Sequence, residues 1–410
     1  MKVKETKGIT LIALVMTIVV LLILAGVVIA TLNGNDNIIK NANTAVGKYN
    51  EKVNEEQGIL NTLEEKLREY TNGGSSNPTT PEEPGTLPTT PTVDSNGLAT
   101  KPTTIKPSTN NANNLQIVIP TGFAPAILQT GTTQSLPGQD GSVKNKMPAS
   151  QWNNITADDI NKGIVVVDAD GNEFEWIPIT DTSKFARSAW GGNASAKLAE
   201  TSTSSAYWED TTTSEYKNMV TSVTNNKGFY VARYEASANS GSTKAQSKRG
   251  VTAWTNISQT NAITKSANYN STLHSHLIYG IEWDSILNWL NGNATISSST
   301  SGETKTMELA DLQTNSCSWG NYYNSTGNAA TNSGSKQTTG KSEYWKANNI
   351  YDLAGNVFEW TQEKYSTGTS RAYRGGYYNF NGDGSPAAYR SSNVASYTNS
   401  SLGFRASFYL

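Results

Sequence analysis

The sequence has little cysteine, histidine and charge, and each shortage removes a class of function. The 410 residues include one cysteine, Cys317, so the chain can form neither an internal disulfide nor a metal site with two thiolates. Two histidines, His274 and His276, are too few for a histidine-rich metal centre. Charged residues make up 16% of the chain and the net charge is −2. Because lysine and arginine are scattered along the chain, we expect no nucleic-acid partner.

The N-terminal part has a long uncharged run. Residues from Ile9 to Leu32 carry no charge, and a helix of about 20 apolar residues is long enough to cross a bilayer. A cleavable signal peptide has a shorter apolar region of about 7–15 residues, so we predict that this run is kept as a membrane helix. The lysines before it favour a cytoplasmic N-terminus, with the rest of the chain outside the cell membrane. Apolar residues continue at helical spacing to Leu67, which predicts a helical stalk to about residue 70.

The residues just before this run carry a more specific pattern. Gly8 followed by "ITLIALV" resembles the prepilin cleavage and methylation segment of type IV pilins and pseudopilins. The resemblance implies that a prepilin peptidase cuts between Gly8 and Ile9, removing residues 1–8 and leaving Ile9 as a methylated N-terminus. The helix of residues 9–70 would then be a membrane anchor that can also pack against other pilin subunits. The family usually has glutamate where this chain has Ala13, which leaves filament assembly open. An uncleaved signal anchor is the alternative.

The rest of the chain divides into a linker and a folded unit. Residues 71–114 are rich in proline, threonine, serine and asparagine, a composition that predicts an extended, disordered spacer. Residues 115–410 hold most of the ten tryptophans and nineteen tyrosines and are predicted to fold as one α+β unit. "GIEWDSILNWL" has the apolar spacing of a helix. Strands are predicted in "LQIVIP", "GIVVVDADGNEFEWIPI", "GFYVARYEAS" and "LGFRASFYL", and loops in the polar stretches 189–226 and 291–342.

Six short motifs follow one another through this unit: "FEWIPI", "GFYVARYEAS", "WGNYY", "IYDLAGNVFEWTQE", "RAYRGGYYNF" and "LGFRAS". In this order they resemble the domain shared by formylglycine-generating enzymes and their non-catalytic relatives. The resemblance implies a variant of the C-type lectin fold over about residues 160–410. Oxidases of this family bind copper through two cysteines, one of them next to the Arg-Gly-Gly segment. This chain has no cysteine there, so we expect neither copper nor enzymatic activity. The related ergothioneine-pathway enzymes need an iron-binding histidine set, which His274 and His276 do not complete.

The same resemblance implies a calcium site in the "DLAGNVFEW" loop. The corresponding positions are Asp352, Gly355, Val357 and Glu359, two with carboxylates and two with backbone carbonyls. Oxygen donors of this kind suit calcium, for which we expect a structural role. The alternative is a loop held by hydrogen bonds of Asn356 and Glu359, with Trp360 in the core.

The segment between Gly376 and Gly403 has a distinct composition. Tyrosine, asparagine, serine and glycine dominate it, and these residues also dominate adaptable binding surfaces. In some lectin-fold proteins this segment is varied by a diversity-generating retroelement, and the residue types that such an element produces match those found here. An ordinary loop-rich terminus is the alternative. The predicted ligand contacts are Tyr377, Tyr378, Asn379, Phe380, Asn381, Asp383, Ser391, Asn393, Ser396, Tyr397 and Asn399.

These patterns together predict an adhesin-like, pilus-associated protein of the cell surface. Its non-catalytic head would bind a protein or glycan ligand. The alternatives are a pseudopilin of a secretion system, a structural cell-envelope protein that binds nothing, and a surface oxidase of the formylglycine-generating type.

Overall fold

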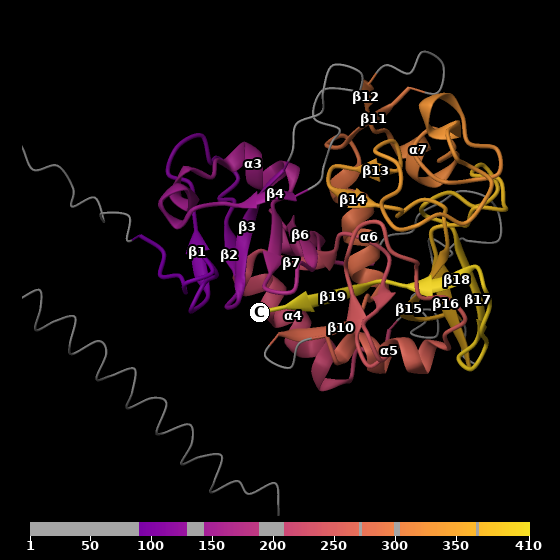
Figure 1. Cartoon of the computed structure of the whole chain (residues 1–410), viewed down its shortest axis with the longest axis horizontal. Helices are drawn as coiled ribbons and strands as arrows, with labels where there is room; N and C mark the ends of the chain where they lie inside the picture. The colour runs from indigo at the N-terminus through magenta and orange to yellow at the C-terminus, as the bar shows by residue number, and fades with distance from the viewer. Residues whose placement is uncertain (1–89, 129–142, 188–208, 270–272, 299–303, 366–368) are drawn as a thin grey trace, which may run out of the picture. The chain divides into compact units, whose positions relative to one another are not determined.

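The computed structural model describes residues 90–128, 143–187, 209–269, 273–298, 304–365 and 369–410 (Figure 1). All of them belong to one compact unit, Thr86–Leu410. The predicted leader, membrane helix and stalk, with the cleavage residues Gly8 and Ile9, lie outside the described residues. Within the described ranges, no helix is long and apolar enough to span a membrane.

A seven-stranded antiparallel sheet contains most of the predicted apolar strands, whereas "LQIVIP" forms β2 (Ile117–Ile119) of a two-stranded sheet. Its strand order is β10-β19-β7-β6-β5-β3-β4. The central strands are buried along their lengths, and Trp176 of β6 pairs with Tyr230 of β7. The bounds are β3 (Phe123–Leu128), β4 (Val143–Lys146), β5 (Val165–Asp168), β6 (Glu173–Pro178), β7 (Gly228–Ala232), β10 (His274–Leu277) and β19 (Ala406–Tyr409).

A second sheet, of four strands, is formed by the C-terminal third of the chain. Its order is β17-β16-β15-β18, and β15 runs parallel to β18 but antiparallel to β16. The bounds are β15 (Phe358–Lys364), β16 (Ser370–Arg374), β17 (Arg390–Val394) and β18 (Leu402–Phe404). Short two-stranded sheets pair β1 (Thr103–Ile105) with β2 (Ile117–Ile119), β8 (Ser237–Ala238) with β9 (Ala245–Gln246), β11 (Thr295–Ser297) with β12 (Thr304–Thr306), and β13 (Lys346–Ala347) with β14 (Ile350–Tyr351).

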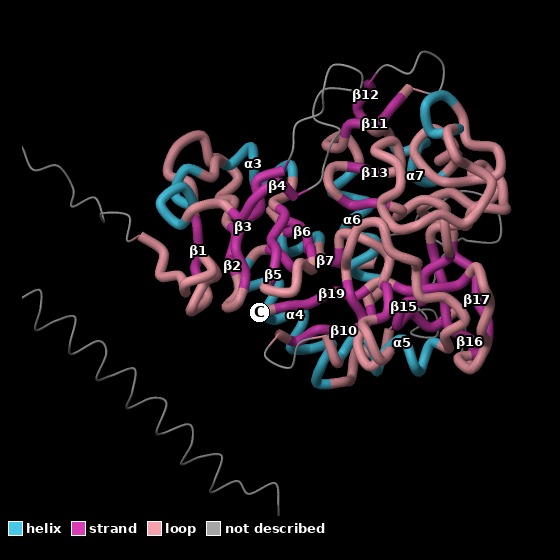
Figure 2. Tube along the Cα trace, viewed as in Figure 1, coloured by secondary structure: helices cyan, strands magenta, loops and turns pink. Residues whose placement is uncertain are grey.

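Helices and long loops complete the unit (Figure 2). The α-helices are α3 (Ala157–Lys162), α4 (Ser214–Asn226), α5 (Gln259–Ala267), α6 (Gly280–Leu290) and α7 (Leu309–Gln313), and the 3-10 helices are η1 (Ala149–Asn154), η2 (Thr182–Lys184) and η4 (Gly327–Ala330). Helix α6 confirms the predicted helix. Elements β11, β12 and α7 lie in a stretch that we predicted to be loop, and helix α4 lies in another; that prediction was wrong for both stretches. Helix α4 is mostly polar, but Thr213 caps its N-terminus and Met219 and Val223 are buried against the core.

The hydrophobic core extends further toward the N-terminus than the sequence indicated. Leu98 and Ile105 are buried in one cluster with Phe123 and Phe174, and β1 pairs with β2. The predicted boundary between linker and folded unit at 114/115 therefore lies too late in the chain, and residues 90–114 belong to the fold. Their polar composition hides the few apolar side chains that pack. The mixed helix and sheet content agrees with the predicted α+β class.

Candidate functional site

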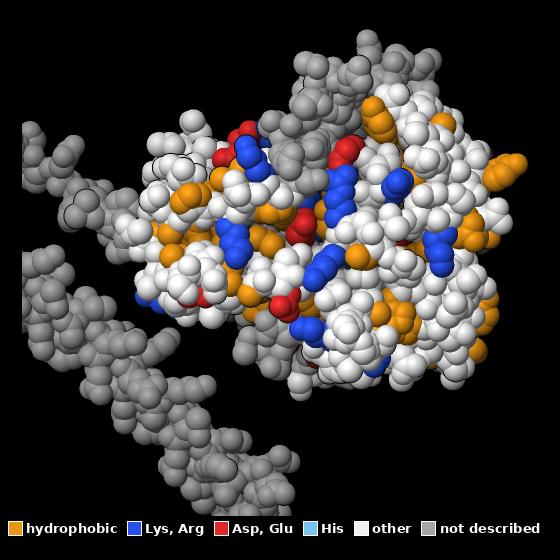
Figure 3. Space-filling model, in the orientation of Figure 1, with side chains coloured by type: hydrophobic (Ala, Val, Ile, Leu, Met, Phe, Trp, Pro, Cys, Tyr) orange, Lys and Arg blue, Asp and Glu red, His pale blue; other side chains and the backbone are white. Residues whose placement is uncertain are grey.

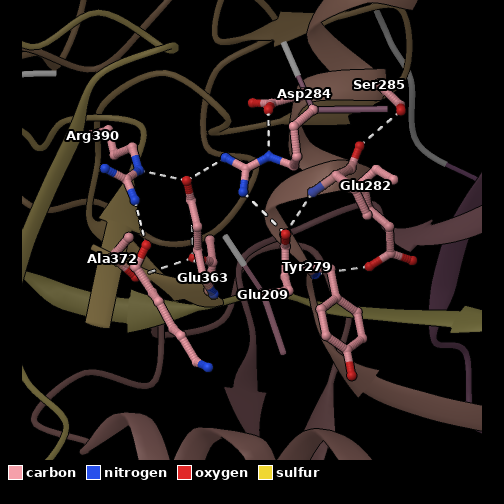
Figure 4. Close-up of polar contacts among 12 residues, drawn as sticks. Glu209, Tyr279, Glu282, Asp284, Ser285, Glu363, Ala372 and Arg390 are labelled. Atoms are coloured by element: carbon pink, nitrogen blue, oxygen red, sulfur yellow. Dashed lines mark hydrogen bonds and ion pairs between the residues drawn. The ribbon is translucent and has the colours of Figure 1, made fainter. Parts of the chain in front are cut away.

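The inner face of the four-stranded sheet is held by a buried network of ion pairs. Glu363 of β15 binds the guanidinium groups of Arg187, Arg390 and Arg374, with Arg390 Nε 2.5 Å and Arg374 Nη1 3.2 Å from its oxygens. Asp284 of α6 binds Arg187 at 2.7 Å and Arg374 at 2.8 Å, and Glu209 binds Arg187 at 3.1 Å. Figure 4 shows Glu363 with Arg390 on one side and Asp284 and Glu209 on the other.

Three arginines and three carboxylates thus balance one another in a site closed to water. Each of the six side chains is at most 2% exposed. Burial raises the pKa of Glu363, but the guanidiniums of Arg187, Arg390 and Arg374 outweigh it and hold that pKa well below its ordinary value. The network joins α6, β15, β16 and β17, so it fixes the strands from which the C-terminal segment emerges.

The opposite face of the same sheet carries the aromatic surface, which we define as Phe358, Tyr373, Tyr377, Tyr378, Phe380, Tyr389 and Tyr397. Tyr389 and Tyr397 both lie near Tyr373. The ring of Phe358 lies 4.8 Å from Tyr373, 4.9 Å from Tyr377 and 5.9 Å from Tyr389, measured between centroids. Tyr377 in turn lies 5.8 Å from Phe380 and 5.6 Å from Tyr378. Hydrophobic side chains reach solvent near β16 and β17 in Figure 3.

All the predicted ligand contacts reach the surface of the unit. Asn379, Phe380, Asn381, Asp383, Ser396 and Tyr397 are exposed, and Tyr377, Tyr378, Ser391, Asn393 and Asn399 are half-buried. Ser391 of β17 lies opposite Tyr373 of β16, so β17 continues the aromatic surface with polar side chains. Asn399 Nδ2 donates to the hydroxyl of Tyr397 at 3.1 Å. The structure thus places these residues on loops and strands of one sheet, at solvent-accessible positions.

A second loop flanks the aromatic surface and was missed in the sequence. The backbone N–H of Tyr323 donates to the carbonyl of Phe380 at 3.0 Å. Asn324 accepts from the Gly382 N–H at 2.9 Å and donates to Asp383 at 3.1 Å. The side chain of Tyr323 is 70% exposed. Phe358 and Tyr373 were also missed, although the alternation of "FEWTQE" and "RAYR" places them on the face opposite the buried charges.

Two glycines set the direction of the C-terminal segment. Gly375 and Gly376 have φ of +89° and +77°, a region that side chains other than glycine rarely adopt. A Cβ at Gly376 would lie 2.2 Å from the Ser385 carbonyl oxygen. The Tyr378 N–H then donates to the Asn356 carbonyl at 3.1 Å. The aromatic surface therefore starts from a backbone turn that the rest of the fold determines.

The predicted calcium residues lie in a loop held by hydrogen bonds and one ion pair. Both carboxylate oxygens of Glu359 bind Arg405, at 2.7 and 3.0 Å, and Glu235 accepts from the Val357 N–H at 2.9 Å. Asp352 accepts from the Gly340 N–H at 2.7 Å, and burial raises its pKa to about 7. Gly355 is part of the same turn, with φ of +80°.

Calcium at this loop stays a prediction. Arg405 would compete with a cation for the carboxylate of Glu359. Within the part of the chain that the structure describes, no group of three or more His, Cys, Asp and Glu side chains is placed to hold a metal ion. The Asn356 side chain also donates to Glu235 at 2.5 Å, and Trp360 is buried. These contacts match the hydrogen-bonded alternative.

The residues with catalytic potential are engaged in the core. Cys317 is buried with its thiol 3.1 Å from Asn324 Oδ1, and burial raises the pKa of that thiol. His276 is buried, with Nδ1 2.8 Å from the His274 carbonyl and Nε2 3.0 Å from Glu282. Burial lowers the pKa of His276, but the carboxylate of Glu282 outweighs this and raises it overall. These contacts place Cys317 and His276 in internal hydrogen bonds.

Residues 208–407 match the family of the sulfatase-modifying factor enzyme 1-like domain. This finding agrees with the resemblance to formylglycine-generating enzymes for the C-terminal half of the chain. No curated protein matches the sequence.

Three solved structures show weak similarity. PvdO from Pseudomonas aeruginosa is 12% identical with a TM-score of 0.29, covering 45% of this chain and 82% of PvdO. CarF is 15% identical with a TM-score of 0.29, covering 45% of this chain and 87% of CarF. Treponema denticola variable protein 1 is 13% identical with a TM-score of 0.24, covering 76% of this chain and all of that protein. Similarities with such low TM-scores add nothing to the match of residues 208–407 with the domain family.

Proposed function

We propose that this chain is an adhesin-like cell-surface protein whose C-terminal domain binds a protein or glycan through the aromatic surface, without catalysis. In this proposal the N-terminal helix anchors the chain in the cell membrane after cleavage between Gly8 and Ile9. The anchor keeps its N-terminus in the cytoplasm and allows association with other pilin subunits.

One observation carries the proposal: the predicted contact segment lies at the surface on a rigid support. Phe380 is 45% exposed and Tyr397 is 36% exposed, and large apolar side chains grouped at a surface mark interaction sites. Tyrosine and phenylalanine have few side-chain rotations to lose, so contacts made by these rings carry a small entropic penalty. The ion pairs of Glu363, Arg374 and Arg390 fix the strands beneath them.

Other functions have less support from the side chains. A two-cysteine copper oxidase is not possible with Cys317 as the single cysteine of the chain. A pseudopilin or a structural envelope protein would need no exposed aromatic cluster on its distal domain, and replacing the cluster would leave its role unchanged.

The binding test uses residues 86–410, a compact unit with its own core. This unit is screened against glycan arrays and purified cell-surface proteins, with calcium and with EDTA. The variant Phe380→Ala/Tyr397→Ala removes two exposed rings, and Leu309→Ala is the matched control because Leu309 is 44% exposed on α7.

We expect a ligand whose affinity falls at least about tenfold in the double variant, because buried aromatic anchors dominate binding energy, and stays unchanged in Leu309→Ala. If no ligand binds, or if the double variant binds as well as the parent, the proposal is wrong. A rise in melting temperature with calcium would support the structural calcium site; equal melting temperatures with calcium and EDTA would contradict it.

A further inference from the structure

A cleft with a volume of about 710 Å³ lies between α3, the end of β6 and the C-terminal half of α6. Its size falls within the range of about 300–1,000 Å³ that is typical of small-molecule sites. It shares no residue with the aromatic surface, so it is a separate feature of the domain.

The two walls of the cleft are joined by hydrogen bonds. Asn161 of α3 donates from Nδ2 to Asn293 Oδ1 at 3.0 Å, and Asn293 Nδ2 donates back to the Asn161 carbonyl at 2.7 Å. The same carbonyl accepts from the indole N–H of Trp289 at 2.8 Å. The Trp289 ring is therefore fixed in the wall, packed in part against the core, with its one polar group already used and the exposed part of the ring left for contact with a ligand.

Uncommitted polar groups lie beside this ring. Among the described residues, the side chains of Thr180 and Asn291 have no protein hydrogen-bond partner. Both line the cleft, Thr180 after β6 and Asn291 just after α6. An amide and a hydroxyl can each donate and accept, so they can serve ligand hydroxyl groups of either orientation.

The charges in the cleft cancel. Asp181 and Lys184 lie 3.7 Å apart, nitrogen to oxygen, and they are the charged residues of the lining. A phosphate-bearing ligand would need arginine or backbone donors around it, which this lining does not supply. A fatty chain would leave the amides without partners.

From this combination of a fixed indole, amides, a hydroxyl and no net charge, we propose that the cleft binds a neutral sugar of one or two rings. The C–H face of the sugar packs against Trp289, and its hydroxyl groups exchange hydrogen bonds with Asn291 and Thr180. This site does not depend on the aromatic surface, so the domain would have two independent binding sites.

The test follows the ¹⁵N-labelled unit 86–410 by NMR during titration with glucose, galactose, mannose, N-acetylglucosamine and maltose, with glucose 6-phosphate as the charged probe. Assignment of the Trp289 indole signal uses Trp289→Phe. We expect saturable shifts of the Trp289 indole and Asn291 amide signals with at least one neutral sugar, and weaker binding of the phosphate.

Variants decide the location of the site. Asn291→Ala and Thr180→Ala change exposed side chains and are expected to weaken sugar binding about two- to tenfold each, as the loss of one neutral hydrogen bond does. Asn261→Ala changes an exposed asparagine of α5 that lies outside both sites; it is the matched control and should leave sugar binding unchanged. The proposal is overturned if none of the sugars binds, if glucose 6-phosphate binds more tightly, or if Asn291→Ala and Thr180→Ala bind like the parent. Failure of the Phe380→Ala/Tyr397→Ala test leaves these readouts unaffected, so the two proposals fail separately.

Discussion

Replacing Glu363 by glutamine should destabilise the domain more than any change in a surface ion pair. Glu363 is the carboxylate shared by Arg187, Arg374 and Arg390. Glu363→Gln keeps the size of the side chain but leaves three buried guanidiniums with the two carboxylates of Asp284 and Glu209. Removing one partner of a buried ion pair lowers the free energy of unfolding by about 3–5 kcal/mol, because the remaining charge stays buried without compensation.

The matched control is Asp158→Asn, which breaks a pair of similar length at the surface. Asp158 lies 2.7 Å from Lys162, and both side chains are about two-thirds exposed, at 68% and 64%. Exposed pairs contribute about 0–1 kcal/mol, so this variant should unfold almost like the parent. Two chemically equivalent acid-to-amide changes should therefore differ clearly in how far they lower the free energy of unfolding.

The assay is urea unfolding of residues 86–410, followed by tryptophan fluorescence and far-UV circular dichroism, whose coincidence checks for intermediates. Because the folded pKa of Glu363 is depressed, its contribution is fully present above the unfolded pKa of about 4.3 and is lost as the pH falls further. The difference in free energy of unfolding between the parent and Glu363→Gln should thus be constant from pH 7 to pH 5 and shrink below about pH 4. Equal unfolding midpoints of the parent and Glu363→Gln at pH 7 would refute the reasoning.

Two further predictions test the turn and the buried histidine. Gly376→Ala should lower the free energy of unfolding by at least about 1 kcal/mol, because alanine is strained at positive φ and its Cβ would meet the Ser385 carbonyl. The same urea assay checks this, and an unchanged unfolding midpoint would contradict the turn geometry. The imidazole of His276 should titrate above the ordinary pKa of 6.5, because Glu282 stabilises its charged form. The contribution of this pair to the free energy of unfolding is therefore present below about pH 6.5 and is lost as the pH rises through the folded pKa. The histidine Hε1 signal measures this by NMR, and titration at or below pH 6.5 would show that the pair is not charged.

Much of the secondary structure could be predicted because the apolar pattern is local. The buried strands β5, β6 and β7 and the helix α6 follow from runs such as "GIVVVD" and "GIEWDSILNWL". Helix α4 could not be predicted in this way, since Met219 and Val223 are its main core contacts among polar neighbours. The start of the domain was misplaced for the same reason, because Leu98 and Ile105 are isolated apolar residues in a polar stretch.

The candidate site was predictable in part. The composition of the C-terminal segment identified the exposed residues Phe380 and Tyr397, because a run of tyrosine, asparagine and serine is a local property. Tyr323, from a loop more than fifty positions earlier, and Phe358 on β15 were missed, since their proximity arises from pairing between distant segments.

The sequence by itself determined the types of residue available: one thiol, two histidines, an uncharged N-terminal run, and a C-terminal segment rich in tyrosine and asparagine. Those counts limit the chemistry whatever the fold. Only the tertiary structure decided that Glu359 is bound by Arg405, that three arginines share Glu363, and that the aromatic rings lie on the face opposite these charges. The physical reason is that ion pairs and surface clusters depend on distances between segments far apart in the chain, and local sequence patterns do not contain those distances.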